Sequence, residues 1–156
     1  MISNLAELDR VRQDCRRLVT KRSLTAAGAA IVPIPGADIL ADIGLLSSML
    51  PAISQRFELD HESVEKLDPA IAERVFVVAA SLGNNVIGRL VTRKFAVALL
   101  RRVGVRLVGA SVAKYVPIVG SAFSASVGFG AMKLAGDAHV EDCYRTARAL
   151  LSDQGS

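Results

Sequence analysis

Apolar residues recur at intervals of three and four along almost the whole chain, and no stretch shows the sustained apolar/polar alternation of a half-buried strand. This spacing predicts amphipathic helices that each bury one face. We therefore expect an all-α fold, a compact single-domain helical bundle of about six or seven helices with Pro/Gly breaks. The stripe of the first helix holds Leu5, Leu8, Val11, Cys15, Leu18 and Val19.

Capping residues, prolines and glycines set the expected helix boundaries. Asn4 and Ser23 are candidate N-caps, and Asp68 precedes a proline, which favours the first helical position. A kink or break is expected near Pro51 and a kink at Gly136. The expected helical stretches are residues 5–20, 24–32, 37–57, 60–67, 69–91, 93–103, 105–115 and 120–151. We expect an amphipathic N-terminal helix in residues 1–22, a helical core domain in residues 23–151, and a disordered tail in residues 152–156.

The hydrophobicity of the chain lies between that of a soluble domain and that of a polytopic membrane protein. Apolar residues make up 51% of the chain, the mean hydropathy is +0.38, and tryptophan is absent. The longest uncharged run, residues 115–132, has 18 residues but contains a proline, three glycines and three serines. A membrane-spanning helix needs about 20 predominantly apolar residues. The other uncharged runs are shorter, and their lengths fit buried helices or re-entrant segments better than membrane-spanning helices.

Charge is strongly segregated along the sequence. Residues 1–73 carry eight Lys/Arg and eleven Asp/Glu, whereas residues 74–136 carry nine Lys/Arg and no acid. We call residues 74–136 the basic block. It predicts attraction to an anionic surface such as lipid headgroups, nucleic acid or an acidic protein. The alternative is that its arginine stems cover the edges of apolar helices. The candidate contact residues are Arg89, Arg93, Lys94, Arg101, Arg102 and Arg106.

The sequence contains no recognisable catalytic motif. GxxxxGK[ST] and GxSxG are both absent. His139 lies four residues before Cys143, so a two-ligand metal site on one helix face is conceivable, but unrelated surface residues are the favoured interpretation. We expect no enzymatic activity, no metal and no cofactor. Two widely spaced cysteines and an N-terminus without an apolar signal region favour a reducing, cytoplasmic location.

Two further features bear on helix packing. Asp38 and Asp42 stand at i and i+4 on one face of an apolar helix. We favour capping plus an ion pair with Lys114 or Arg89 over acid/base catalysis. Small residues also recur every four positions, which allows close packing of helix backbones. We favour packing within the chain over self-association or bilayer insertion. These rows are Gly120, Ser124 and Gly128, and in parallel Ala122, Ser126 and Gly130.

Two segments, residues 26–38 and 114–138, together resemble a known family. The residues that carry the resemblance are Pro33, Pro35, Gly36 and Asp38 in the first segment, and Lys114, Pro117 and Gly120 in the second. The pair resembles the helical domain of unknown function found beside bacterial Era-like GTPase domains and in some inner-membrane proteins. It is also similar to the helical tail of immunity-related GTPases. The resemblance implies a membrane-associated or GTPase-associated helical module without catalysis of its own. This chain lacks a GTPase domain, so nucleotide switching would come from a partner.

These observations lead to one main functional expectation and three rivals. We expect a non-enzymatic helical module at the inner face of the cytoplasmic membrane, bound to anionic lipid, a membrane protein or a GTPase from another chain. The first rival is a pore-forming or toxin-like protein that inserts residues 115–132. The second is a soluble oligomeric partner of a GTPase, in which the chain forms a homo-oligomer. Nucleic-acid binding is disfavoured, because no helix-turn-helix or aromatic platform is present. We also expect the 33–36 turn to pack near residues 114–120.

Overall fold

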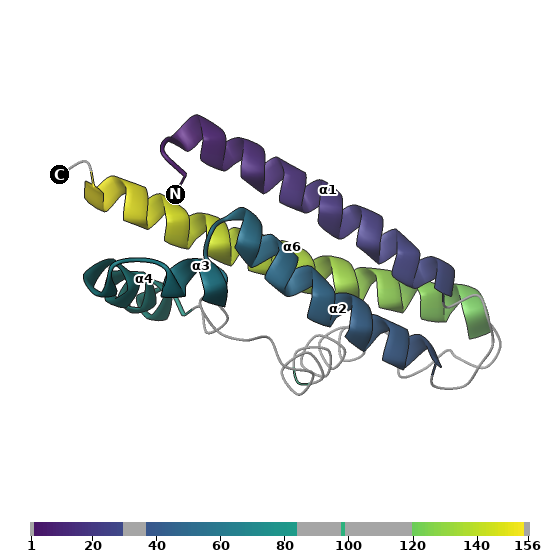
Figure 1. The fold of residues 1–156 in the computed structure, drawn as a ribbon. Helices are drawn as coiled ribbons and strands as arrows, with labels where there is room; N and C mark the ends of the chain where they lie inside the picture. The colour runs from purple at the N-terminus through teal and green to yellow at the C-terminus, as the bar shows by residue number, and fades with distance from the viewer. Residues whose placement is uncertain (1, 30–36, 84–97, 99–119, 155–156) are drawn as a thin grey trace. The chain divides into compact units, whose positions relative to one another are not determined.

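The computed structural model describes residues 2–29, 37–83, 98 and 120–154, and all regular structure in this part of the chain is α-helical (Figure 1). The all-α prediction is therefore confirmed. The predicted number of helices stays a prediction, because most of residues 84–119 lie outside the described residues. The helices are α1 (Leu5–Ala29), α2 (Ala37–Arg56), α3 (His61–Glu65), α4 (Pro69–Ser81) and α6 (Gly120–Gln154).

Helices α1 and α6 are both longer than predicted. The predicted break between Thr20 and Leu24 is wrong, because α1 continues to Ala29. Ser23 is fully buried inside α1 and does not cap a second helix. No proline interrupts this stretch, and a serine is small enough to lie on the buried face. Helix α6 likewise reaches Gln154, so residues 152–154 are helical where we expected the start of a disordered tail.

Helix α2 contains Pro51 and ends in a left-handed turn. Proline lacks an N–H group, so one hydrogen bond of the helical ladder is missing at Pro51. At the C-terminus, Glu58 has a φ of 56°, and the Leu59 N–H donates to the Ser54 carbonyl at 2.9 Å. This 6→1 bond is typical of a Schellman cap, in which glycine is the usual left-handed residue. The cap turns the chain toward α3.

The cap of α4 follows the sequence prediction, whereas the start of α3 and the end of α4 do not. Asp60 caps α3, and the Asp68 carboxylate accepts a hydrogen bond from the Ala70 N–H at 2.9 Å, with Pro69 at the first helical position. The predicted continuation of this helix to about Val91 is wrong, because α4 ends at Ser81. Gly83 has a φ of 74°, which glycine adopts readily and which stops a right-handed helix.

The chain divides into two compact units. Unit 1 comprises Met1–Arg17, Leu50–Val91 and Ala138–Ser156, and unit 2 comprises Leu18–Met49 and Thr92–Asp137. Helices α1, α2 and α6 therefore each contribute residues to both units. Large buried side chains of unit 1 include Leu8, Ile53, Phe57, Val64, Val75 and Val140. Those of unit 2 include Val19, Leu46, Met49 and Met132.

Helix α6 lies close to two other helices of unit 2 at Gly136. A Cβ atom there would lie 2.6 Å from Val19 Cγ1 and 2.9 Å from Met49 Cε. We predicted that the row of small residues that includes Gly130 allows close helix packing. A Cβ at Gly130 would have no neighbour within 4 Å, so none of the described helices packs closely at this position. Helix α6 continues through Gly136 without a break. This glycine therefore serves close packing of α6 against α1 and α2, which the sequence prediction of a kink missed.

Candidate functional site

Most of the predicted site residues lie outside the described residues. This applies to the six candidate contact residues of the basic block and to Pro33, Pro35, Gly36, Lys114 and Pro117. Asp38 and Asp42 lie in the first turns of α2, and Gly120, Ser124 and Gly128 lie in the first turns of α6. The predicted ion pair of Asp38 and the predicted packing of residues 33–36 against 114–120 therefore stay predictions.

Helix α4, in unit 1, exposes an apolar surface at the start of the basic block. Phe76 is 42% exposed and Val77 is 61% exposed, while Val75 and Ala79 are buried. Spacings of three and four place Phe76, Val77 and the exposed Ala80 on one side of the helix, which we call the α4 outer face. Glu73 lies on the same side. Sequence reasoning predicted this helix but not its outer face, although its apolar run is longer than one buried stripe needs.

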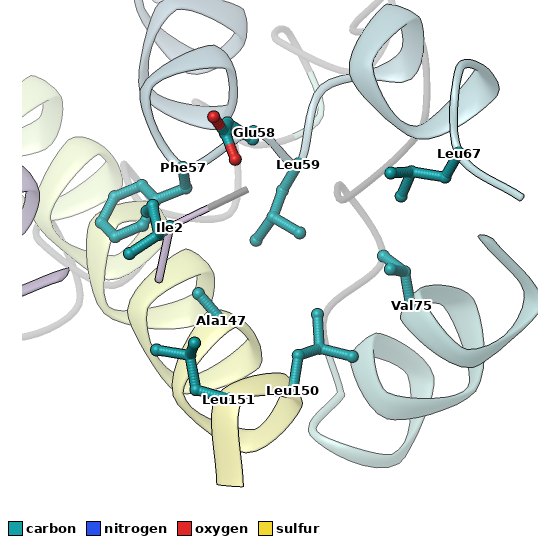
Figure 2. Close-up of a pocket in the computed structure, with 9 residues that line it drawn as sticks. All are labelled: Ile2, Phe57, Glu58, Leu59, Leu67, Val75, Ala147, Leu150 and Leu151. Atoms are coloured by element: carbon teal, nitrogen blue, oxygen red, sulfur yellow. The ribbon is translucent and has the colours of Figure 1, made fainter. Parts of the chain in front are cut away.

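A small apolar hollow lies elsewhere in unit 1 (Figure 2). Its volume is about 20 Å³, which is close to the space of one water molecule. Ligand pockets usually measure about 300–1,000 Å³, so this hollow is the size of a packing defect. Glu58 is the one charged residue in its wall. The lining residues are Ile2, Phe57, Glu58, Leu59, Leu67, Val75, Ala147, Leu150 and Leu151.

An ionic network joins α1 to α6 within unit 1. Arg12 donates to both carboxylate oxygens of Glu141, at 2.9 and 2.6 Å, and Arg16 donates to the same carboxylate at 2.6 Å. The Arg12 guanidinium also lies 4.4 Å from the centre of the Tyr144 ring, whose hydroxyl donates to Asp9. Hydrogen bonding to Arg12 lowers the pKa of Glu141, although partial burial opposes this. The network fixes the register of the two helices.

We expect Glu141→Gln to lower the free energy of unfolding by about 1–2 kcal/mol, because two arginines lose their carboxylate. Urea unfolding followed by circular dichroism measures the change. The Glu141 pKa is lowered in the fold, so this stabilisation is present above its ordinary value of 4.5 and is lost as the pH falls below it. The control is Glu62→Gln, which breaks an exposed pair with Lys66. Equal effects of the two variants would contradict a structural role for the network.

A polar cluster is buried in unit 1 between α2 and α6. His139 Nε2 lies 2.9 Å from Ser54 Oγ and 3.6 Å from Cys143 Sγ. His139 is 4% exposed, Ser54 is 3% exposed and Cys143 is fully buried. The prediction that His139 and Cys143 share a helix face is confirmed, and their interpretation as unrelated surface residues is wrong. Ser54 could not be assigned to the cluster from the sequence, because it lies 85 positions from His139.

Burial dominates the chemistry of this cluster. It lowers the pKa of His139 to about 4 and raises that of the Cys143 thiol, so both groups are neutral at pH 7. Burial also raises the pKa of Cys15 to about 11. Hydroxyl and imidazole are paired as in a nucleophile–base dyad, but their burial leaves a substrate no access. No group of three or more potential metal ligands gathers in the part of the chain that the structure describes.

Comparison of the chain with protein-family models, with curated proteins and with solved structures finds no match. Among the helices that the structure describes, none combines the length and the apolar character needed to cross a membrane.

Proposed function

We propose that the chain is a non-enzymatic helical module that associates peripherally with an anionic membrane surface at the cytoplasmic face. The observation that carries this proposal is the exposure of Phe76 and Val77 in α4, within a stretch of sequence that carries basic residues and no acids. Exposed apolar side chains can enter the headgroup region, and basic side chains are attracted to anionic lipid. The resemblance to membrane-associated helical domains supports the same assignment.

The two contributions have different physical signatures. A basic residue near an anionic surface contributes about 1 kcal/mol, and this attraction is screened by salt within about 10 Å at 0.1 M. Apolar burial contributes about 25 cal/mol per Å² and is far less sensitive to salt. Arg89, Arg93, Lys94, Arg101, Arg102 and Arg106 supply the first contribution in this proposal, and the α4 outer face supplies the second.

The electrostatic contribution is tested with vesicles. Charge reversal of Arg101, Arg102 and Arg106 to glutamate is expected to weaken binding to phosphatidylserine-containing vesicles by about 100-fold, measured by co-sedimentation at 0.1 M salt. The control reverses Arg10, Arg17 and Lys21, three exposed residues of α1 outside the basic block, with the same change in net charge. Equal losses in the two triple variants would mean that net charge, and not the basic block, controls binding.

The apolar contribution is tested by Phe76→Ser combined with Val77→Ser. This variant is expected to bind the same vesicles less tightly while the dependence of binding on salt stays as in the parent protein. Unchanged affinity for the vesicles would show that the α4 outer face does not contact the membrane. Salt-insensitive binding or dye leakage from the vesicles would favour the inserting alternative that uses residues 115–132.

The alternative proposal is that a protein, and not a membrane, binds these surfaces. A membrane protein, a GTPase from another chain or a second copy of this chain would each use exposed apolar residues. Washing cell membranes with high salt or carbonate separates the cases. Release by salt supports peripheral electrostatic binding, resistance to carbonate supports insertion, and absence from the membrane fraction supports a partner off the membrane.

A further inference from the structure

The histidine at the centre of the buried cluster joins two helices that are distant in sequence. His139 projects from α6 and contacts Ser54 of α2, and hydrogen bonding to the Leu50 backbone also involves α2. The same Nε2 atom lies beside the Cys143 thiol one helical turn further along α6. Neutral imidazole suits this position, because its Nε2 lone pair can accept a hydrogen bond from the hydroxyl or the thiol.

Three carboxylates lie close in sequence to this imidazole, and each is in an ion pair. Asp137, two positions before His139 and therefore on a different side of α6, binds Lys133, while its Oδ1 atom is buried with no hydrogen-bond partner in the described part of the chain. On α6, Glu141 binds Arg12 and Arg16 of α1, and Asp142 binds Arg145 at 2.6 Å. In the described part of the chain, the Cys15 thiol of α1 interacts with Cys143 and is itself paired with Arg56 of α2. No carboxylate is recorded among the hydrogen-bond partners of His139 in the described residues. An imidazolium would therefore be buried without a counter-ion, which is costly.

We propose that His139 is an acid-sensitive latch in unit 1, which holds α2 against α6 while it is neutral and releases them when it is protonated. Protonation places a hydrogen on both ring nitrogens and a positive charge between Ser54 and Cys143. The charge is satisfied by water only if the two helices separate around the ring. Opening exposes Cys143, which is fully buried in the closed form.

The pKa values set the window in which the latch acts. The pKa of an open, solvated histidine is about 6.5, whereas that of buried His139 is about 4. Above pH 6.5 both forms are neutral, so the closed form loses nothing. Between pH 6.5 and 4 the open form binds a proton that the closed form rejects. The closed-to-open ratio therefore falls by a factor of about 80 between pH 6.5 and pH 4.

Cys143 reports the opening directly. Its reaction with 4,4′-dithiodipyridine, which modifies thiols in acid, is followed from pH 7.5 to pH 4 in the full chain carrying Cys15→Ala. The fraction open is obtained by dividing the reaction rate by that of the urea-unfolded chain at the same pH, and it is expected to rise by about 80-fold between pH 6.5 and pH 4. His139→Gln keeps a polar group beside Ser54 but does not titrate, so its fraction open should stay flat until Glu141 is protonated below pH 4.5.

His61 provides the matched control, because it is the other histidine of the chain and is half-exposed beside Glu65. His61→Gln should leave the pH dependence unchanged. The proposal is overturned if His139→Gln opens with the parent pH profile, or if His61→Gln abolishes that profile. Histidine NMR shifts of the unmodified chain give a second test that survives misfolding of a variant. A His139 signal that titrates near pH 6.5 in the closed form would also overturn the latch.

Discussion

Replacement of Phe57 by alanine is expected to lower the free energy of unfolding by about 3–5 kcal/mol. Phe57 is 2% exposed, directly follows α2 and forms part of the wall of the small hollow in unit 1. Truncation removes an aromatic ring from the core and joins its volume to the existing hollow, so the neighbouring Leu59 and Leu150 lose contacts on one side. Urea unfolding monitored by circular dichroism gives the change.

Phe76→Ala is the matched control, since it is the same substitution in the same unit at a position that is 42% exposed. Its effect on unfolding should be within about 0.5 kcal/mol, as is usual for surface sites. The two variants should exchange roles in the vesicle assay, where Phe76→Ala weakens binding and folded Phe57→Ala does not. A loss of stability in Phe76→Ala as large as that in Phe57→Ala would show that the α4 outer face is covered in the native protein.

The second large effect that we expect is a loss of stability on substitution of Gly136. Alanine is favoured over glycine in a helix by about 1 kcal/mol, so an uncrowded glycine in α6 should gain stability on substitution. Gly136→Ala is instead expected to lose about 1–3 kcal/mol, because the new methyl group would lie 2.6 Å from Val19 Cγ1 and 2.9 Å from Met49 Cε. Val19 is β-branched and buried, so it cannot easily rotate away.

Gly130→Ala in the same helix is the control and should stabilise the protein by about 0.5–1 kcal/mol, since its Cβ would have nothing within 4 Å. Thermal unfolding of the two variants should therefore shift in opposite directions. Combining Gly136→Ala with Val19→Ala should recover part of the loss, because the second change makes room for the added methyl. Stabilisation by Gly136→Ala alone would contradict the close approach of the helices.

Local signals in the sequence predict local structure well here. Asp68 and Pro69 mark the start of α4 because a capping carboxylate and a missing N–H both suit a helix N-terminus. The all-helical class follows from the three-and-four spacing of apolar residues. The end of α4 was placed too late because a glycine permits a left-handed turn but does not require one. At Gly83 the chain adopts that turn.

Long-range contacts could not be predicted in the same way. Glu141 and Arg12 are 129 positions apart, and the sequence around either residue does not identify the other as its partner. The burial of His139 is likewise decided by where α2 packs, which the sequence around residue 139 does not contain. Gly136 was interpreted as a kink because glycine weakens a helix, whereas its function in close packing depends on Val19 and Met49 from two other helices.

The exposed side of α4 also affects how the purified protein behaves in solution. Phe76 and Val77 face water in the free chain, so molecules that collide through this side gain a weak mutual attraction. The formal net charge of +4 at pH 7 opposes such collisions, but added salt screens that repulsion. Hydrophobic attraction weakens on cooling. Concentrated samples should therefore be clearest at low ionic strength in the cold, and turbidity should rise as they are warmed in high salt.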